Sequence, residues 1–138
     1  MNTSGPESPG SMRRGSDRPL EVYCDGRGAR PDGKGSAYAW ICADTGQQHV
    51  ERLDGLTNNQ AEYRAILSAL SSFEPGSYVR IRTDSELVAF QLKGKYTVKD
   101  STLRNLRAQI FQVLREKSLR VSVRWIPRAE NRADSLLR

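Results

Sequence analysis

The sequence has few of the residues that hold small proteins together through disulfides or bound metals. Among its 138 residues are two cysteines, Cys24 and Cys42, and a single histidine, His49. Both cysteines lie within predicted strands, and so low a count is typical of reduced, buried thiols in a cytosolic protein. A chain of this length can bury roughly two thirds of its unfolded surface, which is enough for a core without disulfides or structural metal. We therefore expect a cytoplasmic protein whose fold depends on packing.

Long hydrophobic runs are also missing. No apolar stretch approaches the roughly 20 residues that a helix needs to span a bilayer, so no membrane segment is predicted. With 37% apolar and 28% charged residues, and no internal repeat, the composition is typical of one soluble domain. The net charge of +6 favours a polyanionic partner without identifying one.

Apolar side chains are almost absent from residues 1–19, which are rich in glycine, proline, serine and charge. Burial cannot offset the entropy cost of ordering such a segment, so we predict a disordered tail. One ordered domain is expected to cover residues 20–138.

Hydrophobic periodicity divides residues 20–138 into strands and helices. Alternating apolar residues predict five strands, at 20–25, 36–43, 47–53, 78–84 and 119–126. Three- and four-residue spacing predicts four helices, at 58–73, 85–92, from 101 onward, and 129–138. The order βββαβααβα places helices between the later strands, which requires parallel pairing there. It favours an α/β fold with a five-stranded mixed sheet flanked by helices.

Acidic residues occur at the positions where such a fold usually binds ligands. Asp25 and Asp84 each end a predicted strand, and open α/β sheets bind ligands beyond the carboxyl ends of their strands. Glu62 lies about one turn inside the first helix, and Asp134 lies in the last. Carboxylates that converge raise one another's pKa unless a cation lies between them. Because neither cysteine nor histidine accompanies them, they suit magnesium or manganese rather than zinc, and two such ions can promote phosphodiester hydrolysis.

Each of these residues also has a structural explanation when taken alone. Asp25 could belong to a turn, and Asp84 could cap the helix that follows it. Glu62 could complement the dipole of its helix, while Asp134 could pair with a neighbouring arginine. It is less probable that all four structural explanations hold at once than that the four residues share one site.

Four motifs resemble those of type 1 ribonuclease H. They are residues 23–26 (Tyr-Cys-Asp-Gly), 57–62 (Thr-Asn-Asn-Gln-Ala-Glu), 83–85 (Thr-Asp-Ser) and 125–134 (Trp-Ile-Pro-Arg-Ala-Glu-Asn-Arg-Ala-Asp). The resemblance covers essentially all of residues 20–138 in the family's order of elements. It implies the ribonuclease H-like fold and endonucleolytic hydrolysis of the RNA strand of RNA–DNA hybrids, which leaves 5′-phosphate and 3′-hydroxyl ends.

The resemblance also implies the cofactors, the partner and the roles of individual residues. Two magnesium ions, which manganese can replace, would be held by the catalytic carboxylates Asp25, Glu62, Asp84 and Asp134, with Asp25 bridging both ions. The hybrid would be bound by Gly26, Asn58, Asn59, Gln60, Ser85 and Arg128. Amide side chains at a helix entry suit this task, because the 2′-hydroxyl that distinguishes RNA from DNA both donates and accepts hydrogen bonds. No protein partner is implied, and a monomer is expected.

The chain departs from the family in three places. Many bacterial members have a loop histidine shortly before the last aspartate, whereas this loop carries Arg128. Asn131 precedes Asp134 by three residues, one fewer than in the family's usual motif. One residue corresponds to a rotation of about 100° around a helix. Either the loop absorbs the deletion or the Asp134 side chain points in a different direction. The basic, tryptophan-containing segment of larger members is also missing. The residues left there for phosphate contact are Lys93, Lys95, Tyr96, Lys99, Arg104 and Arg107, so salt-sensitive binding is expected.

Two alternatives stay open at this point. The shortened spacing and the missing histidine favour a hybrid-binding module that keeps the fold without cleaving. The other alternative is a different nuclease of the same superfamily, such as a junction resolvase or a proofreading exonuclease. The exonucleases have Asp-x-Glu on the first strand, whereas this chain has Asp25-Gly26-Arg27.

Overall fold

The structure is a computed structural model that describes residues 18–138. Its five strands form one sheet in the order β4-β3-β2-β5-β6. They are β2 (Leu20–Arg27), β3 (Ser36–Cys42), β4 (Gln48–Leu53), β5 (Tyr78–Thr83) and β6 (Arg120–Trp125). The strands β2, β3 and β4 pair antiparallel, whereas β5 runs parallel to both β2 and β6. The predicted mixed sheet is confirmed.

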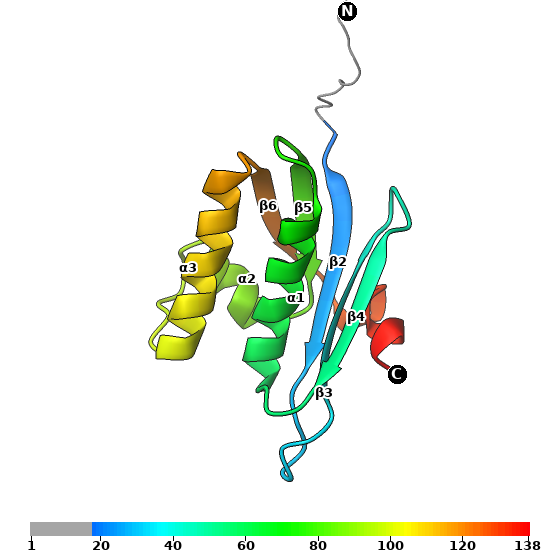
Figure 1. The fold of residues 1–138 in the computed structure, drawn as a ribbon, viewed down its shortest axis with the longest axis vertical. Coiled ribbons are helices and arrows are strands. Elements are labelled where there is room, and N and C mark those ends of the chain that lie inside the picture. The colour runs from blue at the N-terminus through cyan, green and yellow to red at the C-terminus, as the bar shows by residue number, and fades with distance from the viewer. Residues whose placement is uncertain (1–17) are drawn as a thin grey trace, which may run out of the picture.

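Three α-helices lie together on one side of this sheet, and the C-terminal turns lie on the other (Figure 1). The helices are α1 (Asn58–Ser72), α2 (Glu86–Leu92) and α3 (Ser101–Glu116). The main core forms between them and the sheet, where Trp40, Tyr63 and Ile66 are among the largest fully buried side chains. Each such side chain contributes roughly 1.5–3 kcal/mol through its burial. Cys24 and Cys42 are buried in the same core as free thiols, as the sequence predicts.

The helix starts follow from local side-chain chemistry. Thr57 Oγ1 accepts a hydrogen bond from the Gln60 amide, and Gln60 Oε1 accepts one from the Thr57 amide, so the two residues form a capping box at the start of α1. Ser85 caps α2, and Asp100 caps α3. These caps satisfy amides that have no partner within their helix.

The C-terminal segment differs from the predicted helix at 129–138. It forms two 3-10 turns, η2 (Arg128–Glu130) and η3 (Asp134–Leu137). Asn131 breaks the run between them, because its side-chain oxygen accepts a hydrogen bond from the Ala133 amide. Leu137 then packs on Ala37 and Ala39, on the sheet face opposite the α-helices. The order of elements is confirmed, with the last helix replaced by these turns.

Two other features of the fold bear on the predictions. The strand β2 continues two residues beyond Asp25, because Gly26 and Arg27 stay paired with β3. The predicted tail lies outside the described residues up to position 17. Within residues 18–138, no helix is both long and apolar enough to cross a bilayer.

Gly26 permits a close approach between β2 and α1. A Cβ atom at this position would lie 2.4 Å from both the Ala61 carbonyl carbon and the Glu62 amide nitrogen. We expect Gly26→Ala to lower the free energy of unfolding by about 1–3 kcal/mol, because rigid backbone must move to make room. Urea denaturation would measure the change.

Gly46→Ala is a suitable comparison for this substitution. Gly46 has a φ of 79°, but no atom lies within 4 Å of the position that a Cβ would take, so its replacement tests backbone strain without a clash. If Gly26→Ala were less destabilising than Gly46→Ala, close packing of β2 on α1 would not be the reason for a glycine at position 26.

Candidate active site

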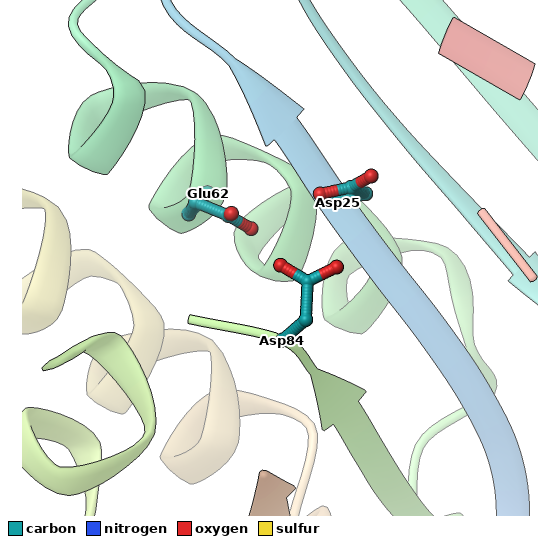
Figure 2. Close-up of side chains that lie close together, drawn as sticks. All are labelled: Asp25, Glu62 and Asp84. Atoms are coloured by element: carbon teal, nitrogen blue, oxygen red, sulfur yellow. The ribbon is translucent and has the colours of Figure 1, made fainter. Parts of the chain in front are cut away.

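Asp25 and Asp84 meet because β2 and β5 are parallel neighbours whose residues are in register at this edge of the sheet. Cys24 is paired with Thr83, the last residue of β5. Asp25 and Asp84 are the next residue on each segment, so both carboxylates lie at the same edge (Figure 2). The Gly26 amide donates a hydrogen bond of 3.0 Å to Asp25 Oδ1, which helps orient that carboxylate.

Glu62 reaches this point from the side of the helices. It lies on the second turn of α1, and its side chain points toward the two aspartates (Figure 2). One carboxylate oxygen from each of Asp25, Glu62 and Asp84 lies within 4.8 Å of the others. Asp25 and Glu62 are only 6% and 7% exposed. The structure therefore brings together three of the four predicted carboxylates in a largely buried cluster, which we call the acidic triad.

The acidic triad is electrostatically unfavourable without a cation. Burial and the nearby Asp84 carboxylate raise the pKa of Asp25 to about 7. Burial, with the charges of Asp25 and Asp84, holds the pKa of Glu62 well above its usual range. The pKa of Asp84 is also raised by burial, although a hydrogen bond from Asn131 acts in the opposite direction.

One oxygen of the triad shows that the residues suit a metal ion. Glu62 Oε1 is buried and has no hydrogen-bond partner among the described residues. An uncompensated buried carboxylate oxygen is costly, and a bound cation would remove that cost. Since all the donors are carboxylate oxygens, they fit a hard divalent cation such as magnesium or manganese.

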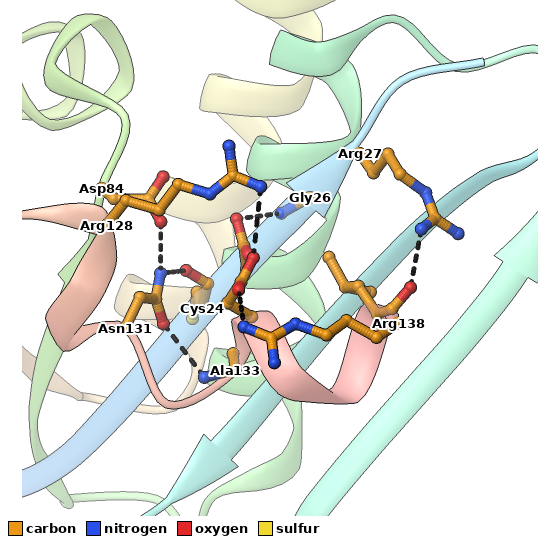
Figure 3. A network of polar contacts seen from close by, with 11 residues as sticks. Cys24, Gly26, Arg27, Asp84, Arg128, Asn131, Ala133 and Arg138 are labelled. Atoms are coloured by element: carbon orange, nitrogen blue, oxygen red, sulfur yellow. Dashed lines mark hydrogen bonds and ion pairs between the residues drawn. The ribbon is translucent and has the colours of Figure 1, made fainter. Parts of the chain in front are cut away.

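Asp134 lies beside the triad but is not one of the three closely grouped residues. It begins η3, on the sheet face opposite α1, and its charge contributes to the raised pKa of Asp25. Its Oδ2 accepts a hydrogen bond of 2.9 Å from Arg138, and Arg128 lies 3.5 Å from its Oδ1 (Figure 3). The hydrogen bond from Arg138 lowers the pKa of Asp134. Asp134 is thus ionised and compensated by two arginines.

Asn131 connects Asp134 to the triad. Its side-chain nitrogen donates to the Cys24 carbonyl at 2.9 Å and to Asp84 Oδ2 at 3.0 Å (Figure 3). Between Asn131 and Asp134 the chain makes a tight turn, in which the Asp134 amide donates to the Asn131 carbonyl.

Replacing Asn131 tests this connection. We expect Asn131→Ala to lower the free energy of unfolding by about 1–3 kcal/mol, because the Cys24 carbonyl and the Ala133 amide lose their partner while buried. Thermal and urea unfolding would measure it. Ser135→Ala removes a single exposed hydrogen bond nearby and should change stability by less than about 0.5 kcal/mol, so equal effects of the two substitutions would contradict the assigned role.

A cleft of about 610 Å³ opens over the acidic triad. Most of the predicted substrate-binding residues line it, namely Gly26, Asn58, Asn59, Ser85 and Arg128. Arg128 is close enough to lower the pKa of all four acidic residues, although this effect is smaller than that of burial in the triad. The cleft therefore combines a negative floor with an exposed cation at its edge.

Two of the predicted substrate-binding amides also have structural roles. Asn58 Oδ1 accepts a hydrogen bond of 2.6 Å from the Gly28 amide, which leaves the Asn58 side-chain nitrogen for other partners. Gln60 uses its side-chain oxygen in the capping box and is not among the residues that line the cleft. Substrate contact by Gln60 therefore stays a prediction, as does phosphate contact by the basic residues between α2 and α3.

Sequence reasoning missed the structural parts of the site. Asn131 belongs to a motif that was recognised, but its spacing from Asp134 gave no indication that it would hold Asp84. Arg27 was given no role, yet its side chain donates a hydrogen bond of 2.6 Å to the Leu137 carbonyl and anchors η3 beside the cleft. No local sequence signal would have paired residues so far apart in the chain.

The RNase H family model matches residues 17–134, which include the whole sheet, all three α-helices and the four acidic residues. The chain belongs to the RNase H family. Ribonuclease HI of Halobacterium salinarum is 32% identical over an alignment of 124 residues, which covers 85% of this chain and 61% of that protein. The chain thus spans about three fifths of the length of this relative.

Solved RNase H structures share the fold. The RNase H1 of Halobacterium salinarum has a TM-score of 0.73 at 32% identity, covering 86% of this chain and 94% of the other. LC11-RNase H1, isolated from compost by a metagenomic approach, was solved in complex with an RNA/DNA hybrid. It has a TM-score of 0.73 at 30% identity, covering 85% and 92% of the two chains. The expected ribonuclease H-like fold is therefore confirmed.

Proposed function

We propose that residues 20–138 form one ribonuclease H domain that hydrolyses the RNA strand of RNA–DNA hybrids as an endonuclease. The single observation that carries the proposal is the acidic triad, in which buried Glu62 Oε1 has no protein partner among the described residues. Membership of the RNase H family and likeness to a relative solved with an RNA/DNA hybrid support this substrate.

The acidic residues would hold two divalent cations. Asp25, Glu62 and Asp84 offer closely grouped oxygens, and Asp134 offers a fourth carboxylate beside Asp25. We propose magnesium as the natural ion, with manganese as a substitute. Bound there, such ions activate a water for attack on phosphorus and stabilise the leaving oxygen. Products with 5′-phosphate and 3′-hydroxyl ends are expected.

The remaining residues of the cleft would bind and orient the hybrid. Arg128 at its edge attracts the phosphate backbone toward carboxylates that would otherwise repel it. The Asn58 side-chain nitrogen and the Asn59 amide group can donate to the 2′-hydroxyl and sugar edge of the RNA strand. Asn131 holds Asp84 in place through a direct hydrogen bond and so acts as a positioning residue.

The proposal is tested by incubating end-labelled RNA–DNA hybrid, RNA duplex and DNA duplex with the protein and Mg²⁺ or Mn²⁺. We expect cleavage of the hybrid alone, at internal positions, and none in EDTA. The 3′-ends should serve as primers for a polymerase, because they carry hydroxyl groups. Glu62→Gln is the matched control, since it keeps the shape of the side chain and removes its charge.

A second candidate is a hybrid-binding module that does not cleave. It is favoured by the two arginines on Asp134, which compete with a cation for that carboxylate. Hybrid binding without cleavage in either metal would support this candidate and exclude the nuclease. The cytoplasmic location and the monomeric state stay predictions from the sequence.

A further inference from the structure

The sheet has a second face that the α-helices do not cover. Side chains alternate along each strand, so Val22 and Cys24 face the helices while Glu21 and Tyr23 face the other way. On the neighbouring strands Val79 and Ile81 face the helices, as do Val121 and Val123. The turn η3 packs on the part of the second face formed by β2 and β3. We call the part formed by β2, β5 and β6 the open face.

The open face is strongly basic. Strand register aligns Tyr78 with Arg120, Arg80 with Ser122, and Arg82 with Arg124 across β5 and β6. Arg132, from the C-terminal segment, lies 5.6 Å from the ring centre of Tyr23, and Arg82 lies 5.5 Å from the same ring. Within residues 18–138, five arginines gather here beside Glu21, which pairs with Arg80 and Arg82. Arg120, Arg124 and Arg132 are exposed.

The open face is continuous with the active-site cleft. A second hollow of about 500 Å³ is lined by Arg128, Asp134 and Arg138, which also line the cleft, and by Arg132, which lies over the open face. Arg82 precedes Asp84 by two residues on the same strand end. A strand of nucleic acid that leaves the cleft on this side would pass Arg132 before it reached the arginines of β5 and β6.

Guanidinium groups in this arrangement suit phosphates better than they suit carboxylates on a polypeptide. Arg80 and Arg82 lie two residues apart on β5, a spacing of roughly 6.6 Å, and Arg82 is aligned with Arg124 on β6 at the strand separation of about 4.8 Å, so the charges lie along two neighbouring strands. Such an array can follow a backbone that carries one charge per nucleotide, and arginine forms paired hydrogen bonds with phosphate.

We propose that the open face of β2, β5 and β6 binds the phosphates of a single nucleic-acid strand that extends beyond the active-site cleft. This site is separate from the acidic triad, so it would retain a hybrid whose strands continue past the point of cleavage. The binding it provides does not depend on hydrolysis, and the two proposals can therefore fail independently.

The test uses a fluorescein-labelled, 20-nucleotide single-stranded DNA, which the proposed reaction does not cleave. Fluorescence anisotropy gives its affinity over a range of salt concentrations for the wild-type chain and for Arg120→Gln/Arg124→Gln. The matched control is Arg115→Gln/Lys117→Gln, which removes two positive charges from the end of α3 on the other side of the sheet. Circular dichroism and cleavage of a short hybrid show that both variants remain folded.

We expect the open-face variant to bind the DNA more weakly and the slope of log affinity against log salt to fall by about 1.4, because roughly 0.7 is lost per phosphate contact on a single strand. The control variant should keep the wild-type slope. An unchanged slope in the open-face variant, or an equal fall in both variants, would overturn the proposal. If the open-face variant instead keeps DNA affinity and loses binding of poly-L-glutamate, the face takes an acidic polypeptide and the nucleic-acid assignment is wrong.

Discussion

We expect Asp25→Asn to reduce hybrid cleavage about a thousandfold while leaving the chain folded. Asp25 is grouped with Glu62 and Asp84, and the charges of both Asp84 and Asp134 raise its pKa. The substitution removes the negative charge and replaces one carboxylate oxygen by an amide nitrogen, so the site would hold divalent cations less tightly. If that costs about 4 kcal/mol of transition-state stabilisation, the rate falls by a factor of about 10³.

Single-turnover cleavage of a labelled hybrid at saturating metal would measure the effect. Asp32→Asn is the matched control, because Asp32 is an exposed loop acid whose side chain accepts a hydrogen bond from the Lys34 amide and lies outside the cleft. The control should cleave at close to the wild-type rate. A loss of less than tenfold in Asp25→Asn would contradict the central place given to this carboxylate.

The second large effect concerns pH and metal. Without divalent ions, we expect the unfolding temperature to fall as pH rises from about 4 to about 8. The pKa of Asp25 is about 7 in the folded chain against 3.8 for the ordinary side chain, so folding is favoured while the group is protonated. This contribution is complete below the unfolded pKa and is lost as pH rises through the folded value. Glu62 and Asp84 have raised pKa values and act in the same direction.

Asp134 acts in the opposite direction at the acidic end. Its pKa is lowered by Arg138, so the stability that it contributes is present above its ordinary pKa and is lost as pH falls. The unfolding temperature should therefore pass through a maximum at about pH 4, near the ordinary pKa of both kinds of group. Above that maximum, the acidic triad dominates because all three of its carboxyls have raised pKa values.

Divalent ions should reverse the loss at neutral pH. A cation that binds only the folded chain stabilises it by about 2.7 kcal/mol when its concentration is a hundred times its dissociation constant. Scanning calorimetry from about pH 3 to 8.5, in EDTA and in Mn²⁺, would measure the pH profile and its reversal by metal. In Asp25→Asn the fall with pH in EDTA should be smaller, and Mn²⁺ should raise the unfolding temperature less. If Mn²⁺ raised the unfolding temperature equally in the wild type and the variant, the metal would bind at a site other than the acidic triad.

The acidic triad is predictable from sequence because general rules place each of its members. Strand ends position Asp25 and Asp84, and the polar entry to an amphipathic helix positions Glu62. The helix starts at Thr57 and Ser85 are predictable for the same reason, since capping chemistry is local. The mixed sheet follows from the order of strands and helices.

The C-terminal segment is less predictable, because long-range contacts decide its form. Its sequence has helical spacing, yet Asn131 bonds to Cys24 and Asp84 rather than permitting a helix. Arg27 then holds the Leu137 carbonyl from a distant strand. Helix propensity depends on the local sequence and therefore cannot predict either contact. The same limit applies to Asn58, whose bond to Gly28 depends on how α1 meets β2.

The capping box at the start of α1 lies beside Asn58 and Asn59, so it links the proposed hybrid-binding surface to folding. Thr57 and Gln60 begin the helix by bonding to each other, and Asn58 ties that helix to Gly28. A substitution that altered RNA contact at these positions would also weaken the helix start, by about 0.5–2 kcal/mol for the cap alone. Selection for a folded chain therefore constrains this surface even when cleavage itself is not under selection. Evolutionary drift toward a new substrate is accordingly easier at Arg128, which caps none of the helices in the described part of the chain, than at the helix entry.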